Sequence, residues 1–82
     1  MRLLAFARAR EVLELAQIDL ELEYDLLPGD TPVTFLDRHF PQARFSLPRG
    51  TRPAVDQDYV AWEDPIPETA RELAILPPVS GG

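Results

Sequence analysis

The last two residues, Gly81 and Gly82, carry the most distinctive chemistry in this sequence. Glycine has no Cβ, so a chain that ends in two glycines can enter a channel too narrow for any other residue, and its carboxylate is unhindered. A terminal carboxyl group with a pKa of about 3.5 is ionised at neutral pH and is a poor electrophile. It therefore needs activation, usually adenylation from ATP, after which the acyl group can pass to an amine, a thiol or a sulfide.

Two prolines, Pro77 and Pro78, stand before this terminus. Proline prevents a strand from continuing and stiffens the chain that follows. The segment from Pro78 to Gly82 can extend roughly 17 Å, enough to reach a site inside a partner protein. The sequence has no cysteine, so any sulfur that the protein handles cannot be carried on a side-chain thiol. We therefore predict that the working group is the Gly82 carboxylate.

Length and charge limit the other possibilities. A chain of 82 residues forms one small domain and has little room for an enclosed active site, so we expect function at a face or a terminus. The net charge of -6 disfavours nucleic acid and favours a basic protein partner, although acidic residues also keep small domains soluble. All eight basic residues are arginine, so the chain cannot form lysine-linked chains of itself. With no run of about 20 apolar residues and no secretory signal, we expect no membrane span and a cytoplasmic protein.

The first part of the chain predicts a strand, a helix and a second strand. Leu3 to Ala7 is a short apolar run that suits a buried strand, and Ala9 to Gln17 contains good helix formers. From Ile18 to Leu26, apolar and acidic residues alternate strictly, which predicts a strand with one buried face, paired antiparallel with the first. The apolar set of this strand is Ile18, Leu20, Leu22, Tyr24 and Leu26.

The middle of the chain predicts a short helix. Pro28 to Asp30 forms a turn, Thr31 is a suitable N-cap, and Pro32 suits the first helical position. Pro41 should end this helix after about two turns.

The last part predicts the remaining strands. Ala43 to Leu47 is weakly strand-like, and a loop with Pro48, Gly50 and Pro53 follows. Ala54 to Trp62 and Leu73 to Leu76 predict two further strands. The order strand, helix, strand, helix, strand, strand predicts an α+β roll in which a mixed sheet covers a helix, with a flexible C-terminal tail.

Three segments of the sequence also resemble a known family. They are FARARE at 6–11, VDQDYV at 55–60 and PPVSGG at 77–82. In this order and at this spacing they resemble the small subunit of molybdopterin synthase, and the resemblance covers essentially the whole chain. Each segment is weak alone, whereas the three together are specific.

The resemblance implies a β-grasp (ubiquitin-like) domain over residues 1–77 and an extended tail over residues 78–82. It implies that an E1-like adenylyltransferase uses ATP to adenylate Gly82, and that a sulfurtransferase then converts Gly82 to a thiocarboxylate. The tail would enter the large subunit, where the sulfur passes to cyclic pyranopterin monophosphate (precursor Z). Two transfers form the molybdopterin dithiolene in a heterotetramer whose catalytic side chains belong to the large subunit. This chain is then a carrier that binds no cofactor.

The resemblance also implies site residues. By motif position, Phe6, Tyr59 and Leu76 belong to an apolar surface that docks on the partners, and Arg10 makes a charged contact. Judged as residues alone, Phe6 and Leu76 could equally be core. The tail residues that would enter the partner are Pro77, Pro78, Val79, Ser80, Gly81 and Gly82.

The sequence departs from the family at two points. The family usually has a Gly-Asp turn before the last strand, where this chain has Glu68 to Arg71. The family commonly has asparagine where this chain has Asp56, and we assign no function to that change.

Other functions remain open. A sulfur carrier for thiamine synthesis or tRNA thiolation would use the same chemistry at Gly82, although Pro77 to Val79 favours the molybdopterin branch. A ubiquitin-like modifier that joins Gly82 to lysines of target proteins belongs to a different class, as does an interaction module with an inert tail. His39 is the one histidine in the sequence and has no accompanying nucleophile or ligand set, so we expect a structural or solvated role.

Overall fold

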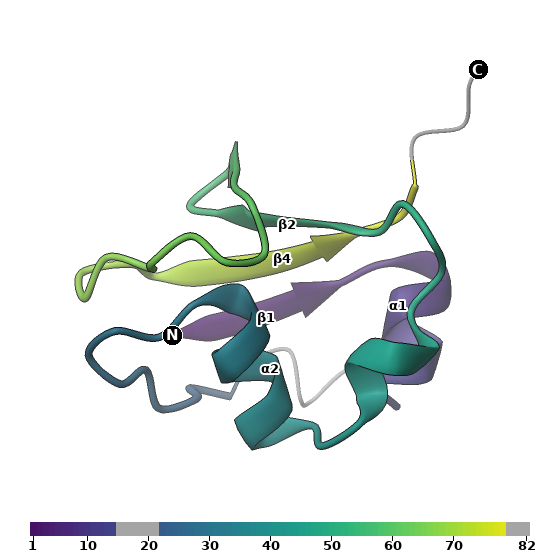
Figure 1. Ribbon diagram of the computed structural model, residues 1–82, viewed down its shortest axis with the longest axis horizontal. Coiled ribbons are helices and arrows are strands. Elements are labelled where there is room, and N and C mark those ends of the chain that lie inside the picture. Colours follow the sequence, from purple (N-terminus) through teal and green to yellow (C-terminus); the bar gives the residue numbers. More distant parts are fainter. Residues whose placement is uncertain (15–21, 79–82) are drawn as a thin grey trace.

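A computed structural model of the protein describes residues 1–14 and 22–78 (Figure 1). These residues form a small α+β fold with a mixed four-stranded sheet. The elements are β1 (Arg2–Ala5), α1 (Ala7–Val12), α2 (Pro32–His39), the 3-10 helix η2 (Ala43–Ser46), β2 (Arg52–Val55), β3 (Asp58–Tyr59) and β4 (Glu72–Leu76).

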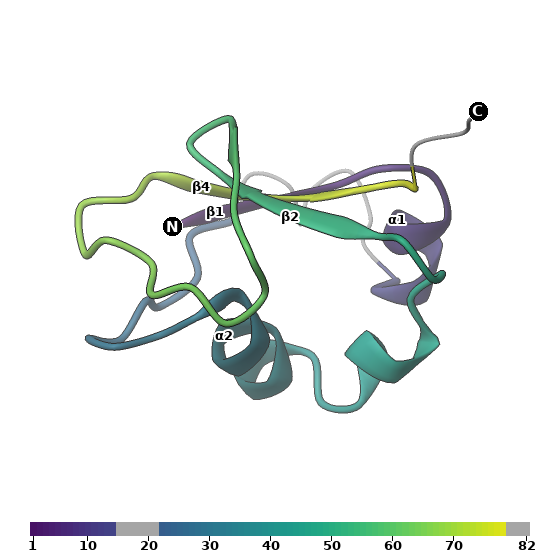
Figure 2. The same ribbon diagram turned by 45° about the horizontal axis from the view of Figure 1, so that its top comes forward.

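The sheet has the strand order β1-β4-β2-β3. The first strand pairs with the last, since β1, at one edge of the sheet, runs parallel to β4. The strand β2 then pairs antiparallel with β4 on one side and with β3 on the other. Parallel strands cannot be joined by a tight turn, and here the connection between β1 and β4 contains every other element. Both α1 and α2 lie on one side of the sheet (Figure 2).

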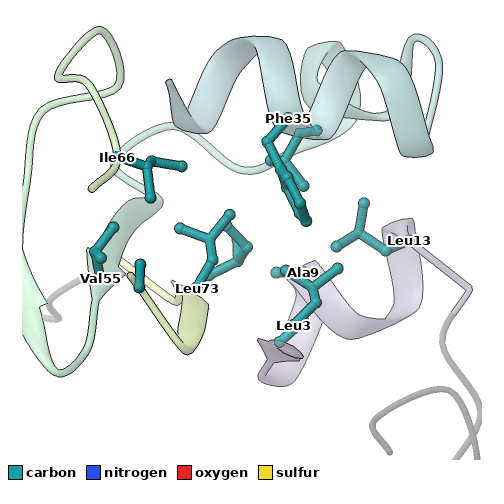
Figure 3. Packing of buried hydrophobic residues seen from close by; sticks show 11 residues of the cluster. Leu3, Ala9, Leu13, Phe35, Val55, Ile66 and Leu73 are labelled. Atoms are coloured by element: carbon teal, nitrogen blue, oxygen red, sulfur yellow. The ribbon is translucent and has the colours of Figure 1, made fainter. Parts of the chain in front are cut away.

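The hydrophobic core fills the space between the sheet and the helices. Successive residues of a strand point to opposite faces, so Leu3, Leu73 and Ile75 share the inner face, and all three are fully buried. Phe35 of α2 lies over Leu3 and Leu73 in Figure 3 and is also fully buried. Burying such a side chain stabilises the fold by about 1.5–3 kcal/mol relative to leaving it exposed.

The predicted helix start at Thr31 is confirmed. The Thr34 N–H donates to the Thr31 hydroxyl at 3.2 Å, and the Thr31 N–H donates to the Thr34 hydroxyl at 2.8 Å, which closes a capping box. Pro32 occupies the first turn, where its missing N–H leaves no hydrogen bond unmade. The helix ends at His39 with Phe40 as C-cap, directly before Pro41 as predicted.

An ion pair joins α2 to the loop before it. The Asp30 side chain is buried, and its carboxylate accepts two hydrogen bonds from the Arg38 guanidinium, at 2.8 and 2.7 Å. The Leu27 N–H and the Thr34 hydroxyl also donate to Asp30, each at 2.8 Å. The hydrogen bonds from Arg38 are the main cause that lowers the pKa of Asp30 from 3.8 to about 2. Burial raises this pKa, but by less. This pair ties the last turn of α2 to the loop before the helix.

The helix predicted from Ala9 to Gln17 has other bounds. The strand predicted from Ile18 to Leu26 is confirmed in its antiparallel pairing with β1. The helix begins at Ala7 and ends at Val12, with Ala9 as its buried residue and Leu13 as a buried C-cap; residues 15–17 of the predicted helix lie outside the described residues. Of the predicted strand from Ile18 to Leu26, residues 18–21 lie outside the described residues. In the rest, one antiparallel bridge joins Glu23 to Arg2, and Tyr24 and Leu26 pack on the core. Leu22 was predicted on the buried face but is exposed.

Two strand predictions in the second half of the chain are wrong. Residues Ala43–Ser46 form a 3-10 helix, which follows Gln42 in the left-handed region at φ +67°. The predicted strand from Ala54 to Trp62 is instead a hairpin of β2 and β3, and β2 begins earlier, at Arg52. Pro53, predicted to lie in a loop, is a buried residue of β2. The last strand, β4, agrees with its prediction.

Candidate functional site on the outer face of the sheet

The outer face of the sheet, opposite α1 and α2, presents one apolar residue from each strand in a continuous row. The register pairs Leu4 with Ala74, Ala74 with Ala54, and Ala54 with Tyr59. Alternation along the strands adds Leu76, two residues beyond Ala74, to the same face. The small alanines are covered by their larger neighbours and form the floor of this face.

A hollow of about 290 Å³ lies over this row, and we call it the outer-face hollow. It is lined mainly by apolar side chains, from Leu4, Phe6, Ala54, Gln57, Tyr59, Glu72, Ala74 and Leu76. Two aromatic rings stand at its rim, since Phe6 is 47% exposed and Tyr59 is 54% exposed. Exposed aromatic rings beside an apolar floor are typical of surfaces that bind another protein.

Charged residues flank the hollow. The Arg52 guanidinium lies 4.1 Å from the centre of the Tyr59 ring, a cation–π contact worth about 0.5–1 kcal/mol at an exposed site. Arg2 and Glu72 form an ion pair at 3.6 Å. This pair stabilises the fold little, because its Arg2 side chain is largely exposed. These contacts restrain the side chains around the hollow while the rings stay accessible.

A tight hairpin places Tyr59 at the hollow. Asp56 and Gln57 form its two-residue turn, and both adopt positive φ, at +47° and +74°. The Asp56 carboxylate accepts from the N–H groups of Arg71 and Glu72, at 3.0 and 3.1 Å. The Asp56 N–H donates to the Glu72 carbonyl at 3.0 Å. Asp56 therefore ties the hairpin to the start of β4. Our sequence reasoning assigned it no role, and the one available signal was an aspartate in a hairpin turn.

The turn before β4 forms without the Gly-Asp pair that the family uses. The Ala70 N–H donates to the Pro67 carbonyl at 2.9 Å, which closes the turn over Glu68 and Thr69. The next two N–H groups then bond to Asp56. The carboxylate of Asp56 thus supports this turn as well as its own.

The predicted docking residues are brought together, with one exception. Phe6 and Leu76 lie at the same end of the sheet because β1 and β4 are parallel, and the Phe6 N–H donates to the Ile75 carbonyl at 3.3 Å. Tyr59 reaches the same hollow from β3. The alternative that Phe6 belongs to the core is wrong, whereas Leu76 is half-buried. Arg10 lies in the last turn of α1, outside the hollow.

The C-terminal segment begins at this same end of the sheet. The strand β4 ends at Leu76, and Pro77 and Pro78 follow it with exposed side chains. The predicted tail residues Val79, Ser80, Gly81 and Gly82 lie outside the described residues. The hollow and the start of the tail are therefore adjacent along β4.

Metal and membrane sites were also sought. Within residues 1–14 and 22–78, no three histidine, aspartate or glutamate side chains are grouped so that they could hold a metal ion. None of the helices in these ranges is long and apolar enough to cross a membrane. His39 lies with its Nε2 atom 2.9 Å from the Asp25 carbonyl oxygen, a contact within the loop–helix junction.

Comparison of the sequence with models of known protein families and with curated protein sequences finds no match. The function of this chain must therefore be inferred from its own residues and their geometry. The outer-face hollow and the segment that follows β4 are the features to explain.

Proposed function

We propose that this protein is a β-grasp sulfur carrier, the small subunit of molybdopterin synthase, and that its reactive group is the Gly82 carboxylate. One observation supports this most strongly. Phe6, Tyr59 and Leu76 are far apart in the sequence, yet they line one exposed apolar hollow at the end of the sheet where the Gly-Gly segment begins. A carrier needs these two parts, a docking surface and a reactive terminus, next to each other.

The fold is compatible with this proposal. A β-grasp roll is expected to pair its first and last strands in parallel and to pack a helix across one face of a mixed sheet. Here β1 and β4 form that pair, and α2 packs over it through Phe35. The bridge between Arg2 and Glu23 adds antiparallel pairing at the free edge of β1.

In the proposed cycle, the outer-face hollow docks on each partner while the tail reaches into the partner's active site. The Gly82 carboxylate attacks the α-phosphorus of ATP, and pyrophosphate leaves. Sulfide (HS⁻) supplied by the sulfurtransferase system then attacks the acyl carbon and displaces AMP, which leaves the thiocarboxylate. On the large subunit this sulfur passes to cyclic pyranopterin monophosphate. The role of this chain is to bind the partner and to deliver the Gly82 acyl group. The exposed rings of Phe6 and Tyr59 are the expected anchors of that binding.

The decisive experiment adds one residue after Gly82. This should abolish sulfur transfer, because the acyl carbon is displaced from the partner's reactive groups, while the urea unfolding curve should not change. The measurement is conversion of precursor Z by the thiolated chain together with a molybdopterin synthase large subunit. An extended variant that still produced molybdopterin would refute the tail mechanism.

The same assay separates the alternatives. If the wild-type thiocarboxylate forms but does not convert precursor Z, a carrier for thiamine synthesis or tRNA thiolation is favoured. Covalent adducts on denaturing gels that depend on Gly82 would instead favour a ubiquitin-like modifier. Activity that survives removal of Gly81 and Gly82 would favour an interaction module.

A further inference from the structure

The turn from Pro48 to Thr51 directly precedes β2 and lies beside the end of β4. The Thr51 N–H donates to the Pro48 carbonyl at 3.1 Å, and the Thr51 hydroxyl donates to the same oxygen at 2.6 Å. Gly50, at the third position of this turn, has φ +89°, as a type II turn requires. Because Thr51 is buried and bonded twice to Pro48, the position of the turn is well fixed.

The register of the sheet brings this turn to the C-terminal segment. In the antiparallel ladder of β2 and β4, Arg52 pairs with Leu76. The same register continued by two residues sets Gly50 opposite Pro78. Proline has no N–H, so Pro78 cannot donate a hydrogen bond to the ladder at this position.

Gly50 and Pro78 pack closely. A Cβ atom built on Gly50 would lie 3.2 Å from the Cβ of Pro78 and 3.9 Å from its Cα. The first distance is shorter than an ordinary van der Waals contact between carbon atoms. Any residue other than glycine would therefore push Pro78 away or distort the turn.

We propose that Gly50 is a positioning residue for the C-terminal segment: its bare backbone forms the surface on which Pro78 packs. Pro77 and Pro78 both have a fixed φ, and a proline also restricts the residue before it, so a single contact on this stiff pair sets the direction of the chain. That direction is the one in which the segment toward Gly82 starts. The role rests on the proposed function, because direction matters when a terminus must be delivered into a partner.

The contact itself can be tested without any partner. In the wild-type protein, NMR should show a nuclear Overhauser effect between the Gly50 Hα and Pro78 Hβ protons. Its absence would overturn the proposal.

The variant Gly50→Ala has a matched control in Gly29→Ala. Gly29 has a similar φ of +84°, but nothing lies within 4 Å of a Cβ built there. Both variants should lose similar stability from backbone strain. We expect Gly50→Ala alone to shift the resonances of Leu76, Pro77 and Pro78, and equal shifts in Gly29→Ala would contradict the proposal.

The expected functional consequence of Gly50→Ala is a lower rate of Gly82 adenylation with unchanged binding to the activating enzyme. With an E1-like adenylyltransferase of molybdopterin synthesis and ATP, Gly50→Ala should lower kcat for adenylation of Gly82 roughly tenfold, because the added Cβ displaces Pro78 and changes the direction in which the segment toward Gly82 starts. KM for the chain should change little, since the outer-face hollow is intact, and Gly29→Ala should retain the wild-type kcat. An unchanged kcat in Gly50→Ala, or an equal loss in both variants, would overturn the positioning role.

A double-mutant cycle identifies Pro78 as the residue through which Gly50 acts. In a Pro78→Gly background, the Cβ and Cγ atoms that meet the new methyl group are gone. Adding Gly50→Ala there should lower kcat clearly less than it does in the wild-type chain. Additive effects would place the cause elsewhere. If wild-type Gly82 is not adenylated at all, the proposed function fails, and the NMR measurements still decide whether Gly50 positions Pro78.

Discussion

The two faces of β4 are built from neighbouring residues but are used differently. Leu73 and Ile75 point inward and are fully buried under α2. Ala74 and Leu76 point outward into the outer-face hollow. Antiparallel pairs, which dominate this sheet, commonly leave one face to solvent, and that face is usually polar. In the described part of this chain the helices cover one face, and the other is apolar at the hollow. Apolar residues on the inner face therefore stabilise the fold, whereas those on the outer face are accessible to a partner.

The largest difference between the two faces should appear in the free energy of unfolding of Leu73→Ala and Leu76→Ala. The two variants remove the same atoms from opposite faces of one strand. Leu73→Ala should lower the free energy of unfolding by about 2–5 kcal/mol, because a cavity remains in the core. Leu76→Ala removes a half-buried side chain and should lower it by about 1 kcal/mol. Urea unfolding monitored by circular dichroism measures both. Equal losses would show that the outer face is as important for stability as the core.

The ion pair between Asp30 and Arg38 should make stability depend on pH. The pKa of Asp30 is lowered in the folded state to about 2, so its contribution is complete above the unfolded pKa of about 4. As the pH falls from about 4 to about 2, the protein should lose about 2 kcal/mol of stability from this group.

The control for this prediction is Asp30→Asn, which should be less stable at pH 7 and should show a weaker pH dependence between about pH 4 and pH 2. Unfolding curves at several pH values compare the two proteins. Parallel pH profiles would show that other carboxylates cause the acid sensitivity.

The smallest effect on stability should come from the rim of the hollow. Tyr59→Ser and Phe45→Ser form a matched pair, since each removes an exposed ring with an arginine stacked on it, at 4.1 Å for Tyr59 and 4.7 Å for Phe45. Each should change the free energy of unfolding by roughly 0.5–1 kcal/mol.

The two variants should differ in binding, because Phe45 lies on η2, outside the hollow. Tyr59→Ser should weaken binding to the large subunit of molybdopterin synthase at least about tenfold, as expected for an interface anchor. Phe45→Ser should bind normally. Isothermal titration calorimetry measures both, and similar affinities would remove the outer-face hollow from the proposed interface.

Parts of the fold could be predicted from local signals. Thr31 and Pro32 are a cap and a first-turn proline, and their hydrogen bonds are made within the same few residues, so the start of α2 was predicted correctly. The run from Leu73 to Leu76, bounded by Pro77, likewise predicted β4. Such signals are reliable because their physical causes lie close together in the chain.

The errors occurred where the cause lies far away in the chain. Tyr59, Val60 and Trp62 give the segment from Ala54 to Trp62 its β character, and no glycine in it marks a turn. The turn at Asp56 is held by the N–H groups of Arg71 and Glu72, which are supplied by the start of another strand. Phe6, Tyr59 and Leu76, which were grouped by motif position, do line one hollow, and their role in docking stays a prediction.

Sequence alone supplies the local features of this protein: a Gly-Gly pair, a stiff proline pair before it, no cysteine and a net charge of -6. Tertiary structure alone decided which residues meet. The parallel pairing of β1 with β4 set Phe6 beside the end of the last strand, and the register of β2 set Gly50 against Pro78. The physical reason is that strand pairing uses backbone hydrogen bonds, which are the same for every residue type. Which strands pair, and in which register, is therefore decided by burial over the whole chain.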